Sequence, residues 1–149
     1  MSSLKMEKEK YWSSKRMDWW QYWNSLIISG RGLLVAGGRD NPRLNSVEMI
    51  NLETMSSCVV DVTLKWPSHA HTGHGNLVCG GSGDGGNHQY CYNVATKTSI
   101  DLINARGFLT SWSTNDGIYL MGGYPSGTTT ELMTGDTSQA GFTLKYTTR

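Results

Sequence analysis

The sequence predicts an all-β fold made of three copies of one four-stranded unit, and three observations lead to it. Glycine makes up 18 of the 149 residues, about 12% against a usual level of about 7%, while only 3 residues are proline. Residues that favour strands, such as Val, Ile, Thr, Tyr and Trp, lie between the glycines. An apolar run that ends in a glycine pair occurs three times at an almost constant step.

The apolar runs are the second strand of each unit. Each run begins with a glycine, continues with four mostly apolar residues and ends in two glycines, at residues 32–38, 75–81 and 117–123. The first glycine of the pair recurs after 43 and then 42 residues, which indicates a structural repeat. Because the four residues do not alternate between apolar and polar, we expect both faces of this strand to be buried.

Three further strands complete each unit. The first strand precedes the apolar run, at residues 25–29, 68–72 and 108–113. The third strand follows the glycine pair and a polar loop, at residues 46–51, 88–93 and 129–133. The fourth strand lies around residues 58–62, 98–102 and 141–145. In the third unit, Asp116-Gly117 between two strand-like runs is a strong hairpin signal. The units therefore cover about residues 25–66, 67–106 and 107–149.

The glycine pairs have two expected structural roles. A glycine can end a strand with a positive φ, and it lets a neighbouring unit approach where a side chain would clash. The six residues expected to act in this way are Gly37, Gly38, Gly80, Gly81, Gly122 and Gly123.

Together these features resemble kelch repeats, the blades of kelch β-propellers. The glycine pairs carry the likeness, and residues 47–51 look like the second core strand of that family. Residues 131–133 and 142–146 are similar to divergent kelch-like proteins of invertebrates, and the resemblance covers about residues 25–149. WD40 repeats have a similar step, but the chain contains no Trp-Asp dipeptide. The chain departs from the family in three respects. Only the second unit has a tyrosine (Tyr90 or Tyr92) in this core strand, and Trp66 and Trp112 match the position of the usual blade tryptophan only loosely. The repeat step is also shorter than the kelch step of about 50 residues.

The resemblance implies a partial β-propeller of three four-stranded kelch-like blades, preceded by a short non-repeat segment. Propellers typically close with about 4–8 blades. Three blades would therefore need further blades or self-association to close the ring.

The resemblance also implies a non-enzymatic module that binds a protein or peptide partner. In kelch propellers the loops after the glycine pairs gather at one mouth of the ring and commonly bind the partner. The matching positions in this chain are Arg39, Asp40, Asn41, Ser82, Asp84, Tyr124 and Ser126. Two alternatives stay open: a fragment of a propeller-type copper oxidase, and a fragment of a secreted or surface adhesion kelch protein.

No residue pattern predicts catalysis, a cofactor or a metal site. His69 and His71 would share one face of a strand and could seat Zn or Cu, but no carboxylate lies close in sequence as a further ligand. The loop at residues 82–87 lacks the spaced acids of a calcium loop and the lysine of a phosphate loop. A formal net charge of +1 lacks the basic excess typical of nucleic-acid binders. We therefore expect no enzyme activity and no nucleic-acid partner.

The cysteines allow one disulfide. Cys58, Cys79 and Cys91 are too few for a disulfide scaffold. Cys79 lies on the apolar strand and Cys91 on the strand after the glycine-rich loop, so they would face each other in a hairpin centred on Gly85. The geometry allows a disulfide to form between them if the protein reaches an oxidising compartment. The alternative is a pair of small buried apolar residues.

Residues 1–24 differ from the repeats, because they hold four of the six tryptophans together with several lysines. On a helix, Trp19, Trp23, Leu26 and Ile27 would share one face. Such a segment could cover an exposed edge, dock a partner or stay disordered, and we do not expect membrane contact. No apolar run is long enough for a signal peptide or a transmembrane helix. The chain as written is therefore expected in the cytoplasm, or outside the cell if its N-terminus is incomplete.

Overall fold

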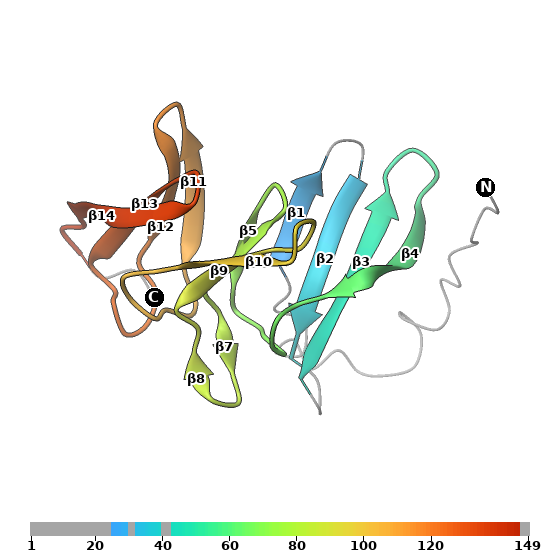
Figure 1. Cartoon of the computed structure of the whole chain (residues 1–149), viewed down its shortest axis with the longest axis horizontal. Coiled ribbons are helices and arrows are strands. Elements are labelled where there is room, and N and C mark those ends of the chain that lie inside the picture. Colours follow the sequence, from blue (N-terminus) through green and yellow to red (C-terminus); the bar gives the residue numbers. More distant parts are fainter. Residues whose placement is uncertain (1–24, 30–31, 40–42, 147–149) are drawn as a thin grey trace.

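The computed structural model describes residues 25–29, 32–39 and 43–146, and its regular elements are all β-strands. The predicted N-terminal segment, residues 1–24, lies outside the described residues. Three four-stranded antiparallel sheets and one two-stranded ribbon make up the fold, which confirms the all-β prediction. The sheets follow one another across the molecule, with the first at the right of Figure 1, the second in the centre and the third at the left.

Each sheet is a meander in which strands that follow one another in the sheet also follow one another in the chain. The first sheet contains β1 (Ser25–Ser29), β2 (Gly32–Gly38), β3 (Leu44–Asn51) and β4 (Ser56–Thr63). The second contains β5 (Thr72–His74), β6 (Leu77–Cys79), β9 (Tyr90–Asn93) and β10 (Thr98–Asp101). The third contains β11 (Thr110–Thr114), β12 (Gly117–Met121), β13 (Thr129–Thr134) and β14 (Thr137–Thr143).

The ribbon is an insertion in the second sheet. Its strands β7 (Ser82–Gly83) and β8 (Gly86–Asn87) form a small hairpin in the connection from β6 to β9. This hairpin extends beyond the end of the second sheet (Figure 1). The glycine-rich segment predicted as a loop is therefore paired at its base and turns at Asp84 and Gly85.

The first strands of the sheets lie next to one another. β5 contacts both β1 and β11. Between β5 and β11, the hydroxyl groups of Thr72 and Ser111 are hydrogen-bonded at 2.9 Å. Adjacent sheets therefore meet face to face, with their first strands side by side.

The predicted start of the first strand is wrong in the second and third units. β5 begins at Thr72 and β11 at Thr110, whereas the sequence predicts strands from residues 68 and 108. Ala70 and Phe108 have φ values of 55° and 60°, which no extended strand contains. Ser68 donates its N–H to the Leu44 carbonyl and accepts from the Gly38 N–H, so its backbone bonds to the preceding sheet. These segments cross from one sheet to the next, and tertiary hydrogen bonds determine their conformation.

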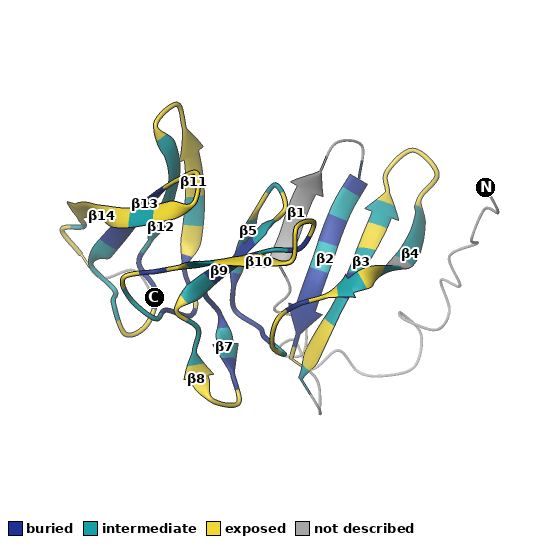
Figure 2. Ribbon diagram, in the orientation of Figure 1, coloured by how far each residue is buried: buried dark blue, intermediate teal, exposed yellow. Residues whose placement is uncertain are grey.

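Two hydrophobic cores hold the sheets together. The first core lies between the first and second sheets and consists of Leu34, Ala36, Val47, Leu64, Val78, Tyr92 and Val94. The second lies between the second and third sheets and consists of Cys79, Cys91, Leu102, Leu109, Leu120 and Met133. In Figure 2, β2 is mostly buried, whereas β10 and β14 are mostly exposed. Burial therefore concentrates on the faces where two sheets meet.

The first glycine of the first two pairs lies where the next crossing segment passes. A Cβ on Gly80 would come within 2.5 Å of the Arg106 carbonyl oxygen and 2.9 Å of a Leu109 methyl carbon. Gly80 also has a φ of 63°, in the left-handed region that L side chains rarely adopt. Gly37 repeats this arrangement against Ser68 and His71. Close approach of the neighbouring sheet, which the sequence predicts for these glycines, is thus observed.

A repeated turn connects the third and fourth strands. Asn51 Oδ1 accepts hydrogen bonds from the N–H groups of Glu53 and Thr54, at 2.9 and 3.1 Å. Asn93 Oδ1 accepts in the same way from Ala95 and Thr96, at 3.0 and 3.1 Å. An Asn side chain that bonds to the backbone two and three residues later stabilises such a turn. The first two units thus share a turn that was not predicted from the sequence.

Candidate functional site

The loops that follow the three glycine pairs are linked to one another. Arg43, after the first pair, forms an ion pair with Asp84 at the tip of the β7–β8 hairpin. Asn87, at the base of that hairpin, donates from its side-chain amide to the Tyr124 carbonyl at 2.8 Å, and Tyr124 follows the third pair. The described parts of the three loops are therefore in contact with one another. We name these residues, together with Phe108 beside Tyr124, the loop surface.

The residues predicted to bind a partner divide into three groups. Arg39, Asp84 and Tyr124 are exposed, and Tyr124 exposes 71% of its surface. Ser82 and Ser126 are half-buried. Asp40 and Asn41 lie outside the described residues.

The two serines have structural hydrogen bonds. The backbone of Ser82 exchanges two hydrogen bonds with His69, at 2.8 and 3.1 Å. The Ser126 carbonyl accepts from both the N–H and the hydroxyl of Thr129, each at 3.0 Å. Of the five predicted positions that the structure describes, Arg39, Asp84 and Tyr124 are therefore the ones that present side chains outward.

Three residues of the loop surface were missed by sequence reasoning. Arg43 and Asn87 connect the loops, and Phe108 exposes 43% of its surface beside the buried His69 ring. The His69 and Phe108 rings meet edge to face, with centroids 6.4 Å apart. Their contacts join residues 37 to 41 positions apart in sequence, and no local pattern predicts pairs at that separation.

The histidines do not share a strand face, so that prediction is wrong. His69 and His71 both precede β5, and the positive φ of Ala70 lies between them. His71 is buried between the first two sheets, where its Nε2 lies 2.9 Å from the Ala36 carbonyl oxygen. Burial lowers the pKa of His71 to about 4, although this hydrogen bond opposes the change. His71 is therefore neutral at pH 7, and its Nε2–H donates to Ala36.

His69 and His88 lie near the loop surface, and their pKa values are also lowered, which favours the neutral form. Burial lowers the pKa of His69, and the positive charges of Arg43 and Arg39 lower it further. Burial also lowers the pKa of His88, with a smaller contribution from Arg43. Within the described ranges, no three His, Cys, Asp or Glu side chains are placed together so as to hold a metal ion.

A buried ion pair connects the second crossing segment to the third sheet. Arg106 and Glu131 expose 0% and 1% of their side chains, and Arg106 Nη2 donates to Glu131 Oε1 at 2.7 Å. Glu131 also accepts from the N–H groups of Ile103 and Asn104, at 2.8 and 3.0 Å, and from the Ser138 hydroxyl at 2.7 Å. Four donors thus converge on one carboxylate.

Arg106 is held by further acceptors from the third sheet. Its Nη1 donates to the carbonyls of Gly122 and Thr129, each at 3.1 Å. The guanidinium therefore bridges Gly122, in the third glycine pair, and Thr129, the first residue of β13. Movement of the crossing segment away from the third sheet would separate this buried pair and leave a buried charge uncompensated, so the pair opposes such a movement.

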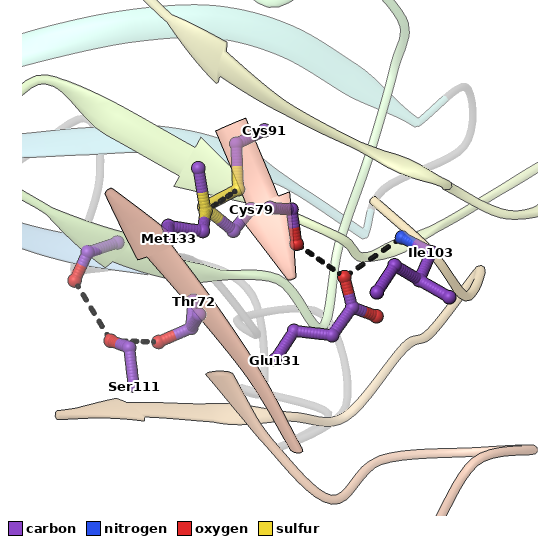
Figure 3. The surroundings of a disulfide bond; sticks show 9 residues. Thr72, Cys79, Cys91, Ile103, Ser111, Glu131 and Met133 are labelled. Atoms are coloured by element: carbon purple, nitrogen blue, oxygen red, sulfur yellow. Dashed lines mark hydrogen bonds between the residues drawn. A yellow bond between two sulfur atoms is a disulfide. The ribbon is translucent and has the colours of Figure 1, made fainter. Parts of the chain in front are cut away.

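Cys79 and Cys91 form a disulfide across β6 and β9, where they occupy directly opposite positions. Both residues are buried, and the Met133 sulfur of the third sheet lies 3.0 Å from the Cys91 sulfur (Figure 3). A disulfide sulfur carries no hydrogen, so this is a packing contact between two sheets. Cys58, on β4, is free.

No protein-family model matches the chain, and no curated protein matches it at a significant level. The described part of the chain contains no helix of the length and hydrophobicity needed to cross a membrane.

Proposed function

We propose that the three sheets are kelch-type blades of a β-propeller and that the protein is a non-enzymatic interaction module. Three features support this assignment: the repeated glycine pairs, the identical meander of the sheets, and their face-to-face packing with the first strands side by side. The proposed partner is a protein or peptide that binds the loop surface.

The linkage of the three loops carries the functional part of the proposal. The ion pair between Arg43 and Asp84 and the bond from Asn87 to Tyr124 hold the loops against one another. A partner would therefore meet a surface whose backbone is already fixed, which lowers the entropy lost on binding. Tyr124 and Arg39 belong to residue types that are enriched among the dominant contacts of interfaces.

Binding can be tested with one pair of matched aromatic variants. Tyr124→Ala removes an exposed side chain on the loop surface, whereas Trp112→Ala removes a similarly exposed one, 67%, on β11. The immobilised full chain and both variants would be compared in capture from an extract of the source organism. We expect proteins that bind the native chain and Trp112→Ala but are lost with Tyr124→Ala.

The unfolding free energy provides the control. Tyr124→Ala should change it by less than about 1 kcal/mol, as expected for an exposed site. A larger loss of stability would assign Tyr124 to the fold. Equal capture by both variants would refute the loop surface as the binding site.

The disulfide favours one of the alternatives, a secreted or surface-attached kelch protein. Disulfides persist in oxidising compartments and are rare in the cytosol. Protein isolated from its source without reductant, denatured and titrated for thiols should then show one free thiol, that of Cys58. Three thiols in this protein would remove that alternative.

A further inference from the structure

Both junctions between sheets use the same contacts. The Gly38 N–H donates to the Ser68 carbonyl at 2.8 Å, and the Gly81 N–H donates to the Arg106 carbonyl at 2.9 Å. Each junction is closed by a leucine after the fourth strand, Leu64 or Leu102, and both leucines are at most 4% exposed. The two junctions therefore show which positions of a sheet are covered by the sheet that follows it.

Among the residues that the structure describes, no sheet follows the third one, which presents these same positions. The N–H of Leu144 donates to the Thr128 carbonyl at 2.7 Å, as Leu64 does to Asn45 and Leu102 to Gln89, so the three leucines correspond. Leu144 is nevertheless half-buried, and Phe142, two residues before it, is 51% exposed. Within the described residues, the N–H of Gly123 has no acceptor corresponding to Ser68 or Arg106.

This side of the third sheet is apolar. Met121 is half-buried, whereas its counterparts Ala36 and Cys79 are at most 2% exposed. The rings of Tyr119 and Phe142 pack with centroids 5.4 Å apart. We name this side, with Tyr119, Met121, Phe142 and Leu144, the trailing face.

The first sheet has the complementary side, and no described residue of another sheet covers it. Val78 and Val94 of the second sheet, and Leu120 and Met133 of the third, pack against the preceding sheet and are at most 4% exposed. The strand registers place Val35 and Ile50 at the corresponding positions of the first sheet, where both are only half-buried. We name this side, with Leu33, Val35 and Ile50, the leading face.

We propose that the trailing face of one chain packs on the leading face of a second copy, so that two chains form a closed head-to-tail dimer. Each face is one half of a junction that occurs twice within the chain, and the chain itself carries the other half. Two copies related by a two-fold axis would make two identical junctions and leave neither face open. Six blades lie within the range of about 4–8 at which propellers close. The inference depends on the blade assignment made above and is independent of partner binding at the loop surface.

The mass of the full 149-residue chain tests the dimer. Sedimentation equilibrium should give twice the chain mass of 16.5 kDa, independent of further increases in concentration. Phe142→Glu and Ile50→Glu, on opposite faces, should each raise the dimer dissociation constant at least about tenfold, since each places a charge in an apolar contact. Ala95→Glu, in the exposed turn between β9 and β10 of the middle sheet, should leave the constant unchanged. Circular dichroism would check that every variant is folded.

Mixing the two face variants distinguishes this arrangement from other dimers. A mixed dimer of Phe142→Glu and Ile50→Glu chains keeps one junction with both faces intact, whereas neither variant alone can make such a junction. We expect dimers to reappear on mixing. A monomer at all concentrations, a polymer that grows with concentration, or dimers unaffected by both substitutions would overturn the proposal. None of these results would change the outcome of the Tyr124 capture experiment, so the two proposals fail separately.

Discussion

Removal of the Glu131 carboxylate should destabilise the protein more than any other single charge change that we consider. Glu131→Ala leaves the fully buried Arg106 guanidinium without its counter-charge and removes the acceptor of the Ile103 and Asn104 N–H groups. Breaking a buried ion pair on one side costs about 3–5 kcal/mol, because the remaining charge stays buried and uncompensated. In a domain of this length, that corresponds to a melting temperature lower by roughly 6–20 °C.

Glu131→Gln separates the charge from the shape of the side chain. Four donors point at the two carboxylate oxygens, and the amide replaces one oxygen by a group that itself donates. We therefore expect Glu131→Gln to be nearly as destabilising as Glu131→Ala. Glu48→Ala is the matched control, because Glu48 takes the same place on the first sheet and is half-buried, and it should cost less than about 1 kcal/mol.

The measurement is urea-induced unfolding followed by circular dichroism, with Arg106→Met added to complete a double-mutant cycle. If the two side chains act as a pair, the double variant should lose less unfolding free energy than the two single variants lose together. The difference should be at least about 1 kcal/mol. A loss below about 1 kcal/mol for Glu131→Ala, or strict additivity of the two substitutions, would refute the view that this ion pair fixes the crossing segment.

Two further predictions concern the junctions between sheets. Gly80→Ala should lower the unfolding free energy by about 2–4 kcal/mol in the same assay, because it adds left-handed backbone strain and a clash with the Arg106 carbonyl. Gly85→Ala should be nearly neutral, because the space around Gly85 is open. Equal losses for both variants would contradict the close approach at Gly80. The second prediction concerns His71, which takes up a proton below about pH 6.5 in the unfolded chain but only near pH 4 in the folded chain. Because the unfolded chain binds this proton first, the unfolding free energy decreases as the pH falls from 7, by about 2 kcal/mol at pH 5. Leu109 takes the position of His71 at the next junction, so leucine is the matched substitution. His71→Leu should reduce the difference in unfolding free energy between pH 7 and pH 5 by about 2 kcal/mol. An unchanged difference would show that His71 does not titrate as the structure requires.

The strands could be predicted from sequence because each unit carries local signals. The apolar run, the glycine pair and the hairpin turn act over a few residues, and β1 and β2 begin and end at the predicted residues. The crossing segments could not be predicted in this way. Residues 68–71 look like a strand, but Ser68 bonds to Gly38 and Leu44 in the preceding sheet, and these contacts override the local preference.

The candidate site was predicted only in outline. The kelch resemblance places the loops at one end, but the contacts that join them come from Arg43 and Asn87, whose residue types are common in solvated loops. Arg106 and Glu131 are 25 residues apart, and charged residues are usually exposed, so nothing in the sequence marks them as a buried pair. Ser82 and Ser126 were predicted to bind a partner, but their backbone groups form hydrogen bonds within the fold and both residues are half-buried.

The meander order of the sheets has a consequence for how the chain reaches its structure. Every strand pairs with a strand that is adjacent in the sequence of its own sheet, so each sheet can form from a short stretch of chain at little loop-closure entropy. Rapid folding of each sheet, followed by docking onto its neighbour, is then expected, as in other repeat proteins with contacts only between nearest neighbours. During synthesis the first sheet would be complete before the second has left the ribosome, and each new sheet would dock on a surface that is already formed.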